Sequence, residues 1–172
     1  MRTRLALVTA VAAVVGCNPS STGLRPGVSS SCTVTLTGAV TGTYNCQPAT
    51  TAWGLGDDMG VFSFGVPQSG SRPGISVAIS WVGEPTVGQY ASADLGAVAH
   101  LALTMSSNQA WLATVGEGTA AAGTYTLAFT SVVNNLSTST GNGYSTEGTL
   151  TASLAPVTGS GSSGTITLSA TF

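Results

Sequence analysis

Two cysteines, Cys32 and Cys46, have a spacing that allows a disulfide bond between them. The Thr- and Gly-rich segment between them can fold as a hairpin with strands at 33–37 and 41–45, which places the two cysteines opposite each other at its open end. A disulfide bond in this position would stabilise the fold by about 3 kcal/mol. Zinc is disfavoured, because two cysteines and one distant histidine do not supply the usual set of four ligands.

His100 is the only histidine of the chain. Its position in the strand-like segment around it is opposite in parity to Leu101 and Leu103, which predicts that it lies on an outer or half-buried strand face. A nucleophile–base pair would need His100 beside a serine and an acid. The chain has so many serines that a nearby one carries no information, and it has no Gly-x-Ser-x-Gly motif. We therefore expect no catalytic residue and no enzymatic cofactor.

The carboxylates have turn-like surroundings. Asp57 and Asp58 are adjacent in a Gly-rich segment, Glu147 lies on the polar parity of a strand, and three others stand beside Pro or Gly: Glu84, Asp94 and Glu117. A glycosidase needs two carboxylates about 5–10 Å apart across a cleft, and turn solvation explains these acids more simply. Calcium at Asp57 and Asp58 is an alternative, because calcium accepts six to eight oxygen ligands.

The three tryptophans are the other candidate ligand residues. Trp81 continues an apolar alternation and is predicted to be a core residue, whereas Trp111 begins a short strand and fits either role. Trp53 is expected in a loop beside Asp57 and Asp58. We predict that Trp53, Asp57 and Asp58 bind a ligand. An exposed indole stacks on sugar rings, and carboxylates accept hydrogen bonds from sugar hydroxyls.

Strands must position all of these residues. Apolar and hydroxyl-bearing residues alternate with period two, and no amphipathic helix is indicated. The alternating runs are 32–36, 62–66, 75–81, 101–105, 125–129, 144–154 and 166–172. Gly-, Ser- and Pro-rich segments separate these runs. The pattern predicts an all-β fold, an antiparallel β-sandwich of about eight or nine short strands with one solvated face on each sheet.

The N-terminus has the pattern of an export signal. Two arginines precede the uncharged run 5–15, which is too short to cross a bilayer as a helix. Val14-Val15-Gly16-Cys17 resembles the lipobox of bacterial lipoproteins, with Val at a position where Leu is commoner. This resemblance implies cleavage before Cys17, lipidation of Cys17 and a stable membrane anchor. In the enterobacterial sorting scheme, Asn18 in place of Asp favours the outer membrane.

These signals divide the chain into a signal peptide (1–16), a lipidated cysteine with a flexible tether (17–31) and one β-sandwich domain (32–172). The tether would hold the domain roughly 20 Å from the bilayer. Beyond the signal peptide, two arginines and six acids remain and there is no lysine. Nucleic acid is therefore not an expected partner.

The sequence predicts a non-enzymatic envelope or surface lipoprotein that binds or displays something, with its domain facing the periplasm or the cell surface. A membrane, held through Cys17, and a glycan or another envelope component are the expected partners. Two alternatives stay open. One is a hydrolase acting on glycan or peptide. The other is a small outer-membrane β-barrel, because Phe172 ends an alternating run as in the terminal strands of such barrels.

Overall fold

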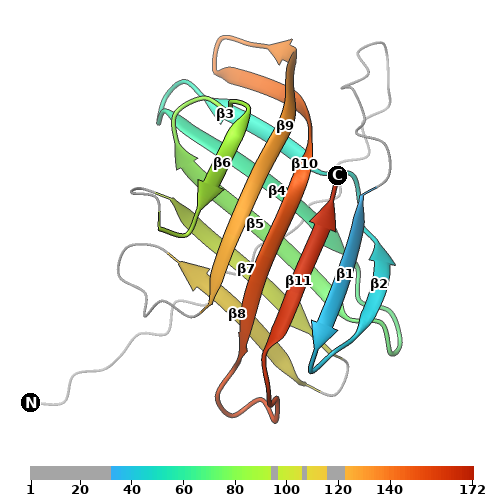
Figure 1. Ribbon diagram of the computed structural model, residues 1–172. Coiled ribbons are helices and arrows are strands. Elements are labelled where there is room, and N and C mark those ends of the chain that lie inside the picture. Colours follow the sequence, from blue (N-terminus) through green and yellow to red (C-terminus); the bar gives the residue numbers. More distant parts are fainter. Residues whose placement is uncertain (1–31, 94–96, 106–107, 116–122) are drawn as a thin grey trace, which may run out of the picture.

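The computed structural model describes residues 32–93, 97–105, 108–115 and 123–172. These residues form eleven β-strands and no helix (Figure 1). The strands are β1 (Thr33–Gly38), β2 (Gly42–Asn45), β3 (Thr50–Gly54), β4 (Met59–Val66), β5 (Gly74–Val82), β6 (Gly88–Ala91), β7 (Val98–Thr104), β8 (Ala110–Val115), β9 (Thr124–Ser137), β10 (Gly141–Pro156) and β11 (Ile166–Thr171). The predicted signal peptide, Cys17, the tether, Asp94 and Glu117 lie outside the described residues. Within the described part of the chain, no helix is long and apolar enough to span a membrane.

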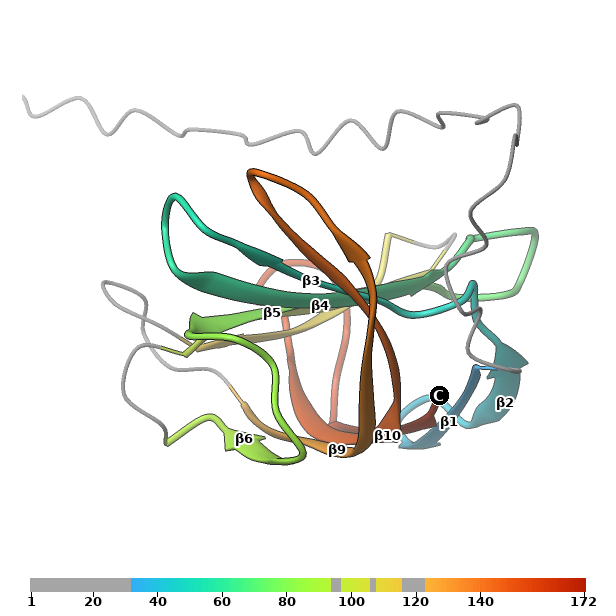
Figure 2. The same ribbon diagram turned by 90° about the horizontal axis from the view of Figure 1, so that it is seen from above.

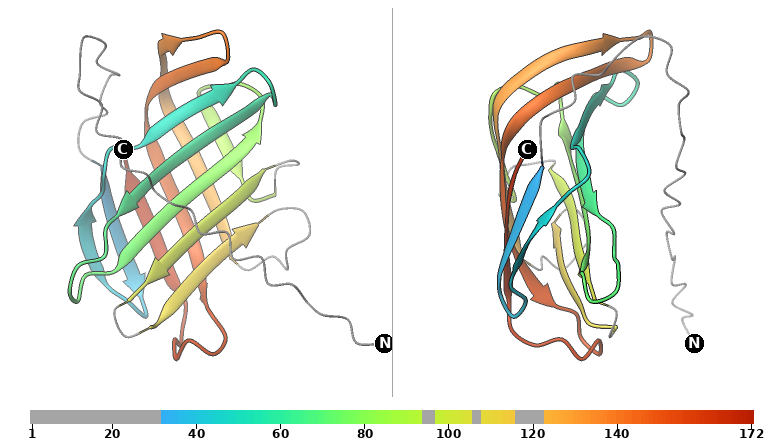
Figure 3. Two further views of the ribbon diagram at one scale, coloured as in Figure 1. Left: turned by 180° about the vertical axis from the view of Figure 1, so that it is seen from behind. Right: turned by 90° about the vertical axis from the view of Figure 1, so that its right-hand side faces the viewer.

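The strands form two packed layers, as the view from above in Figure 2 shows. One layer contains β2, β1, β11, β10, β9 and β6, and the other contains β3, β4, β5, β7 and β8. Strand β10 joins the layers, because its first residues pair with β3 and its last two pair with β8. All the pairings are antiparallel, and the strands of the two layers run obliquely to each other in the left view of Figure 3. The predicted antiparallel sandwich is confirmed.

The structure has eleven strands, whereas the alternation predicted about eight or nine. Strands β3 (TTAWG) and β6 (GQYA) were missed because neither has a clear apolar alternation. Strands β9 and β10 are not short, with 14 and 16 residues. Their pairing contains register shifts at Gly143/Tyr144 and Glu147/Gly148. Each shift changes which face the following residues occupy, so the outer half of this hairpin shows no simple period.

The inward-facing residues fill the space between the layers. They include the predicted apolar positions of β1, β4, β5, β7, β9, β10 and β11. Phe172, at the end of the chain, packs against Phe62 with ring centroids 4.5 Å apart and against Phe129 at 6.0 Å. The backbone of Phe172 also exchanges hydrogen bonds of 2.9 and 3.1 Å with Gly148. A Cβ at Gly148 would stand 2.0 Å from the Ala128 carbonyl oxygen, so this contact requires glycine.

The outer faces carry hydroxyls, as the sequence predicts. One cross-strand row on the first layer reads Thr43, Thr35, Ser169, Thr151 and Thr126. Threonine suits this position because its branched side chain fits a pleated, half-buried surface. The same residues give the face a polar surface without charge.

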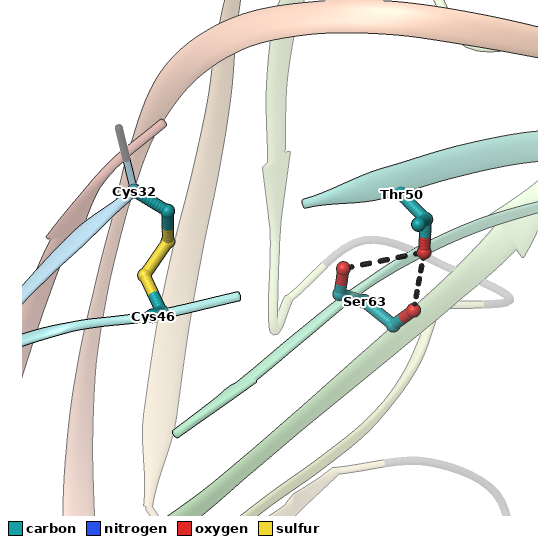
Figure 4. The surroundings of a disulfide bond; sticks show 4 residues. All are labelled: Cys32, Cys46, Thr50 and Ser63. Carbon is teal, nitrogen blue, oxygen red and sulfur yellow. Dashed lines mark hydrogen bonds between the residues drawn. A yellow bond between two sulfur atoms is a disulfide. The ribbon is translucent and has the colours of Figure 1, made fainter. Parts of the chain in front are cut away.

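The β1–β2 hairpin carries a disulfide bond between Cys32 and Cys46 (Figure 4). The Cα atoms are 5.1 Å apart, and the Cys46 amide donates to the Cys32 carbonyl at 3.0 Å. Val34 lies opposite Tyr44, which confirms the predicted register. Gly38 turns the chain at φ +101°, where a Cβ would stand 2.4 Å from a neighbouring carbonyl oxygen.

Candidate functional site

Trp53 lies in strand β3, not in the loop that the sequence suggested. It shares the inward parity of buried Thr51, but it stands at the end of the strand and is only half-buried. Its indole Nε1–H donates a hydrogen bond of 3.0 Å to Oδ1 of Asp58. The structure therefore brings together two of the three predicted ligand residues.

Asp58 closes the β3–β4 turn, which spans residues 55–58. Its backbone adopts φ +50°, a left-handed conformation that Asp tolerates better than most residues. Its carbonyl accepts a bond of 2.7 Å from the Gly83 amide, which ties the turn to the end of β5. Leu55 is likewise bonded to Thr140 at the tip of the β9–β10 hairpin, at 3.1 Å. The turn is thus held at both sides, and Asp57 and Asp58 are exposed on it.

The last inward-facing row of the second layer contains two tryptophans. The pairings place Asn142, Trp53, Gly60 and Trp81 side by side on β10, β3, β4 and β5. A Cβ at Gly60 would stand 2.4 Å from Cε2 and 2.5 Å from Nε1 of Trp81. The Trp81 ring therefore lies across Gly60, the residue that separates it from Trp53 in this row. Trp81 is only 4% exposed, which confirms it as a core residue.

The opposite layer supplies a second aromatic wall. The Tyr90 ring in β6 lies 4.5 Å from the Trp81 ring, centroid to centroid, and Phe129 in β9 lies 5.9 Å from it. The Tyr90 hydroxyl accepts a hydrogen bond of 2.9 Å from the Thr86 amide. The aromatic residues thus continue from one layer to the other at this end of the sandwich.

The indole N–H of Trp81 is buried and has no hydrogen-bond partner within the described residues. Leaving a buried donor unsatisfied costs about 1–3 kcal/mol. Such orphaned groups are rare in folded proteins, and this one is enclosed by the core rather than open to a ligand. This donor lies at Gly60, in the same row as Trp53.

A second aromatic–carboxylate pair lies at the same end. The Tyr144 hydroxyl donates a hydrogen bond to Oε1 of Glu84, in the connection that follows β5. Tyr144 stands opposite Thr51, whose hydroxyl is bonded at 2.8 Å to that of buried Thr146. Burial, and then the bond to the Glu84 carboxylate, raise the pKa of Tyr144. Sequence reasoning missed this pair because its members are 60 residues apart.

Among the described residues, the carboxylates of this end have no cationic neighbour. The described part of the chain contains one arginine, Arg72, which lies in the β4–β5 turn at the opposite end of the sandwich. The chain has no lysine. Three acids, Asp57, Asp58 and Glu84, therefore concentrate negative charge at one end of the fold. We call this group, with Trp53, Trp81, Tyr90 and Tyr144, the aromatic end.

The other candidate residues lie elsewhere. His100 is exposed on the outer face of β7 between Ala78 and Thr114, as predicted, and Glu147 is exposed in β10. Trp111, left open by the sequence, is buried and donates to the Gly164 carbonyl at 3.0 Å. In the ranges that the structure covers, no three His, Cys, Asp or Glu side chains come together to hold a metal ion.

Comparisons of this chain with protein-family models, with curated proteins and with solved structures find no match. The class of protein is therefore defined by the fold alone, an antiparallel β-sandwich with an aromatic, acidic end. Since one fold serves many functions, a functional argument has to come from the site.

Proposed function

We propose that this chain is an exported, membrane-anchored envelope or surface lipoprotein whose sandwich binds a glycan at the aromatic end and does not turn it over. The observation that carries the binding role is the Trp53–Asp58 pair, a half-buried indole held by an exposed carboxylate. The Glu84–Tyr144 pair adds a second such combination at the same end.

The chemistry of these groups suits sugars. An aromatic ring covers the apolar face of a sugar, while a few well-placed carboxylate and hydroxyl groups bond its hydroxyls. The bond from Trp53 to Asp58 restricts the indole before a ligand arrives. Restraining a side chain in this way lowers the ordering cost of binding, which is about 0.5–1.5 kcal/mol for a flexible side chain.

A binding role is favoured over hydrolysis by the position of His100. It lies on the outer face of β7, whereas the exposed acids of the aromatic end lie beyond the ends of β3 and β5. A general base must come within hydrogen-bond reach of the group it activates. His100 and these acids therefore do not make one catalytic set.

The membrane anchor rests on the lipobox-like residues Val14–Cys17. Lipidation of Cys17 and placement in the outer membrane follow from that resemblance. Palmitate labelling of cells should mark the normal chain and should be lost in Cys17→Ala, which should also leave the membrane fraction. Labelling that persists in Cys17→Ala would contradict the anchor but not the binding role.

The binding role is tested on a glycan array with the full chain in detergent micelles. Trp53→Ala should weaken binding of the captured glycan about tenfold or more, since a stacked aromatic ring contributes about 1–3 kcal/mol to the binding free energy. His100→Ala, a change on the outer face, is the matched control and should bind normally. An array with no ligand would contradict glycan binding. Hydrolysis of a glycan or peptide that is lost in His100→Ala or Asp58→Asn would contradict the absence of turnover.

A further inference from the structure

We infer that two copies of this chain pair face to face through the outer surface of the second layer, which contains β3, β4, β5, β7 and β8. The left view of Figure 3 turns this surface toward the viewer. The inference goes beyond the proposed glycan binding and does not depend on it. It rests on the composition of this surface, on its shape and on its area.

The outward residues of the two layers differ in kind. On the first layer they are mainly hydroxyl-bearing, as in the row from Thr43 to Thr126. On the second layer they are mainly apolar, and one row continues across six strands. The pairings place its members side by side in the order Leu136, Gly143, Ala52, Val61, Ser80 and Val98. We call this row the apolar row, and the outer surface of the second layer the apolar face.

The apolar row exposes large side chains to solvent. Val61, Val98 and Leu136 are 41%, 46% and 44% exposed. Val82, at the next outward position of β5, is 62% exposed. Contiguous apolar surfaces of this kind mark the places where proteins meet a partner.

The polar groups of the apolar face are already bonded within the chain. The Thr50 and Ser63 hydroxyls share a hydrogen bond of 2.8 Å, and the Ser80 hydroxyl donates to the Val98 carbonyl at 3.5 Å. His100 is the only titratable side chain that the described strands of this layer direct outward. Covering this face therefore removes little charge from water, so the desolvation cost is low.

The shape of the apolar face is self-complementary. Beside the apolar row lies a hollow of about 520 Å³ over β4 and β5, bordered by Pro48 and Pro67. Small side chains form its floor: Ser63, Gly65, Ser76 and Ala78. A two-fold axis between the row and the hollow would place the apolar row of each copy in the hollow of the other. Such an isologous contact closes with two subunits.

The area of the apolar face suits a dimer. Neighbouring strands lie about 4.8 Å apart and rise about 3.3 Å per residue, so five strands of five to nine residues and the adjoining part of β10 cover about 500–600 Å² in projection. The relief of the side chains makes the accessible area larger. A stable complex buries about 800 Å² of accessible surface on each partner. Complexes of that size have dissociation constants of about 1 μM or lower.

A lipid surface is a less suitable partner for the apolar face. Proteins meet the membrane interface with Trp, Tyr, Lys and Arg side chains. The described strands of this layer direct none of these four types outward. A second copy fits better, because it brings no carboxylate to the contact and only His100 as a possible charge, so like-charge repulsion does not oppose the pairing.

The oligomeric state of the full chain tests this inference. Light scattering in detergent micelles, with the detergent mass subtracted, should give the mass of two chains at about 50 μM protein. Val61→Asp and Val98→Asp together should weaken pairing about 100-fold or more, because each copy would bury two carboxylates against an apolar surface. Both positions are exposed, so the variant should keep the strand-rich circular dichroism of the normal chain.

The matched control carries the same two charges on the other layer. Thr35 and Thr151 are exposed on its outer face and are separated by one strand, as Val61 and Val98 are. Thr35→Asp and Thr151→Asp together should leave the mass of two chains unchanged.

Cross-linking in membranes gives the answer without detergent. Ala78→Cys places a thiol in the floor of the hollow, near the expected two-fold axis, so a short bis-maleimide should join two chains. Thr151→Cys, on the outer face of the first layer, should not be cross-linked. A pair that detergent separates would still be found in this way.

Three results would overturn the inference. The first is the mass of one chain together with no cross-link through Ala78→Cys. The second is a dimer that survives Val61→Asp and Val98→Asp. The third is binding of Cys17→Ala to vesicles of phosphatidylethanolamine and phosphatidylglycerol that is lost on the same two changes, which would identify lipid as the partner of the apolar face. None of these results bears on glycan binding, which is tested through Trp53.

Discussion

The two ends of the sandwich use tryptophan in opposite ways. Trp111 belongs to the packed end, where its N–H is bonded to the Gly164 carbonyl and the loop after β10 covers the start of β8. At the aromatic end, the Trp81 N–H has no described partner and Trp53 is only half-buried. The packed end is made of Gly- and Ser-rich turns, while the aromatic end gathers Asp57, Asp58 and Glu84.

The difference separates structural from functional use of one residue type. A buried polar group in a purely structural setting is normally satisfied, as at Trp111. Departures from that rule are expected where a protein meets a ligand. The comparison supports a structural role for the packed end and is the basis of the recognition role proposed for the aromatic end, and the two roles can be tested separately.

The largest expected effect is on stability at the packed end. Trp111→Ala should lower the free energy of unfolding by about 3–5 kcal/mol, as truncation of a buried aromatic side chain does. Urea denaturation measures this change. Trp53→Ala, at the aromatic end, should cost much less because its side chain is half-buried. Equal losses for the two variants would break the comparison.

The disulfide should contribute slightly less. Replacing both Cys32 and Cys46 by serine removes a link between residues 14 positions apart, which should cost about 3 kcal/mol of unfolding free energy. Ligand affinity, measured well below the unfolding midpoint, should not change, because the hairpin lies outside the aromatic end. Free thiols at both positions in the protein purified without reductant would contradict the bond itself.

The two indole donors should respond differently to the same substitution. Trp111→Phe deletes a satisfied hydrogen bond worth about 0.5–1.5 kcal/mol, whereas Trp81→Phe deletes an orphaned donor that costs about 1–3 kcal/mol. Both variants lose the same ring volume, so this loss cancels in the comparison. Trp111→Phe should therefore be the less stable of the two variants. Calorimetric unfolding of both variants gives the difference, and the reverse order would mean that Trp81 has a partner.

The smallest expected effect is on the titration of Tyr144. Its raised pKa means that its hydroxyl stays protonated in the folded chain where an ordinary tyrosine ionises. The associated stability is complete below about pH 10, the usual pKa, and is lost as the pH rises through the folded value. Absorbance titration should show a late component that disappears in Tyr144→Phe and moves to lower pH in Glu84→Gln. A late component that is unchanged in both variants would contradict this assignment.

Much of the fold could be predicted because it depends on local patterns. Period-two alternation located most inward-facing residues, and the spacing of Cys32 and Cys46 gave the register of the first hairpin. Strand β3 could not be found in this way because it has only two inward-facing residues, Thr51 and Trp53, and Thr51 is polar. Two such residues do not make a recognisable apolar alternation. The outer half of the β9–β10 hairpin could not be predicted for a related reason, because its bulges interrupt the period-two alternation.

The site was predictable only where its members are neighbours in sequence. Trp53 and Asp58 are five residues apart and meet across one turn. Glu84 and Tyr144 meet through the pairing of β10 with β3, which depends on strand order, and strand order has no local signal. The orphaned N–H of Trp81 is likewise a property of its packed surroundings, because the sequence marks this residue only as apolar core.

The most direct test of the central claim uses the three indole N–H resonances, which report on both ends at once. In ¹⁵N-labelled full chain, Trp→Phe variants assign the signals of Trp53, Trp81 and Trp111. Titration with the glycan that the array identifies should shift the Trp53 signal and leave the Trp111 signal in place. A saturable shift of Trp111 alone, or no indole shift at saturation, would contradict recognition at the aromatic end.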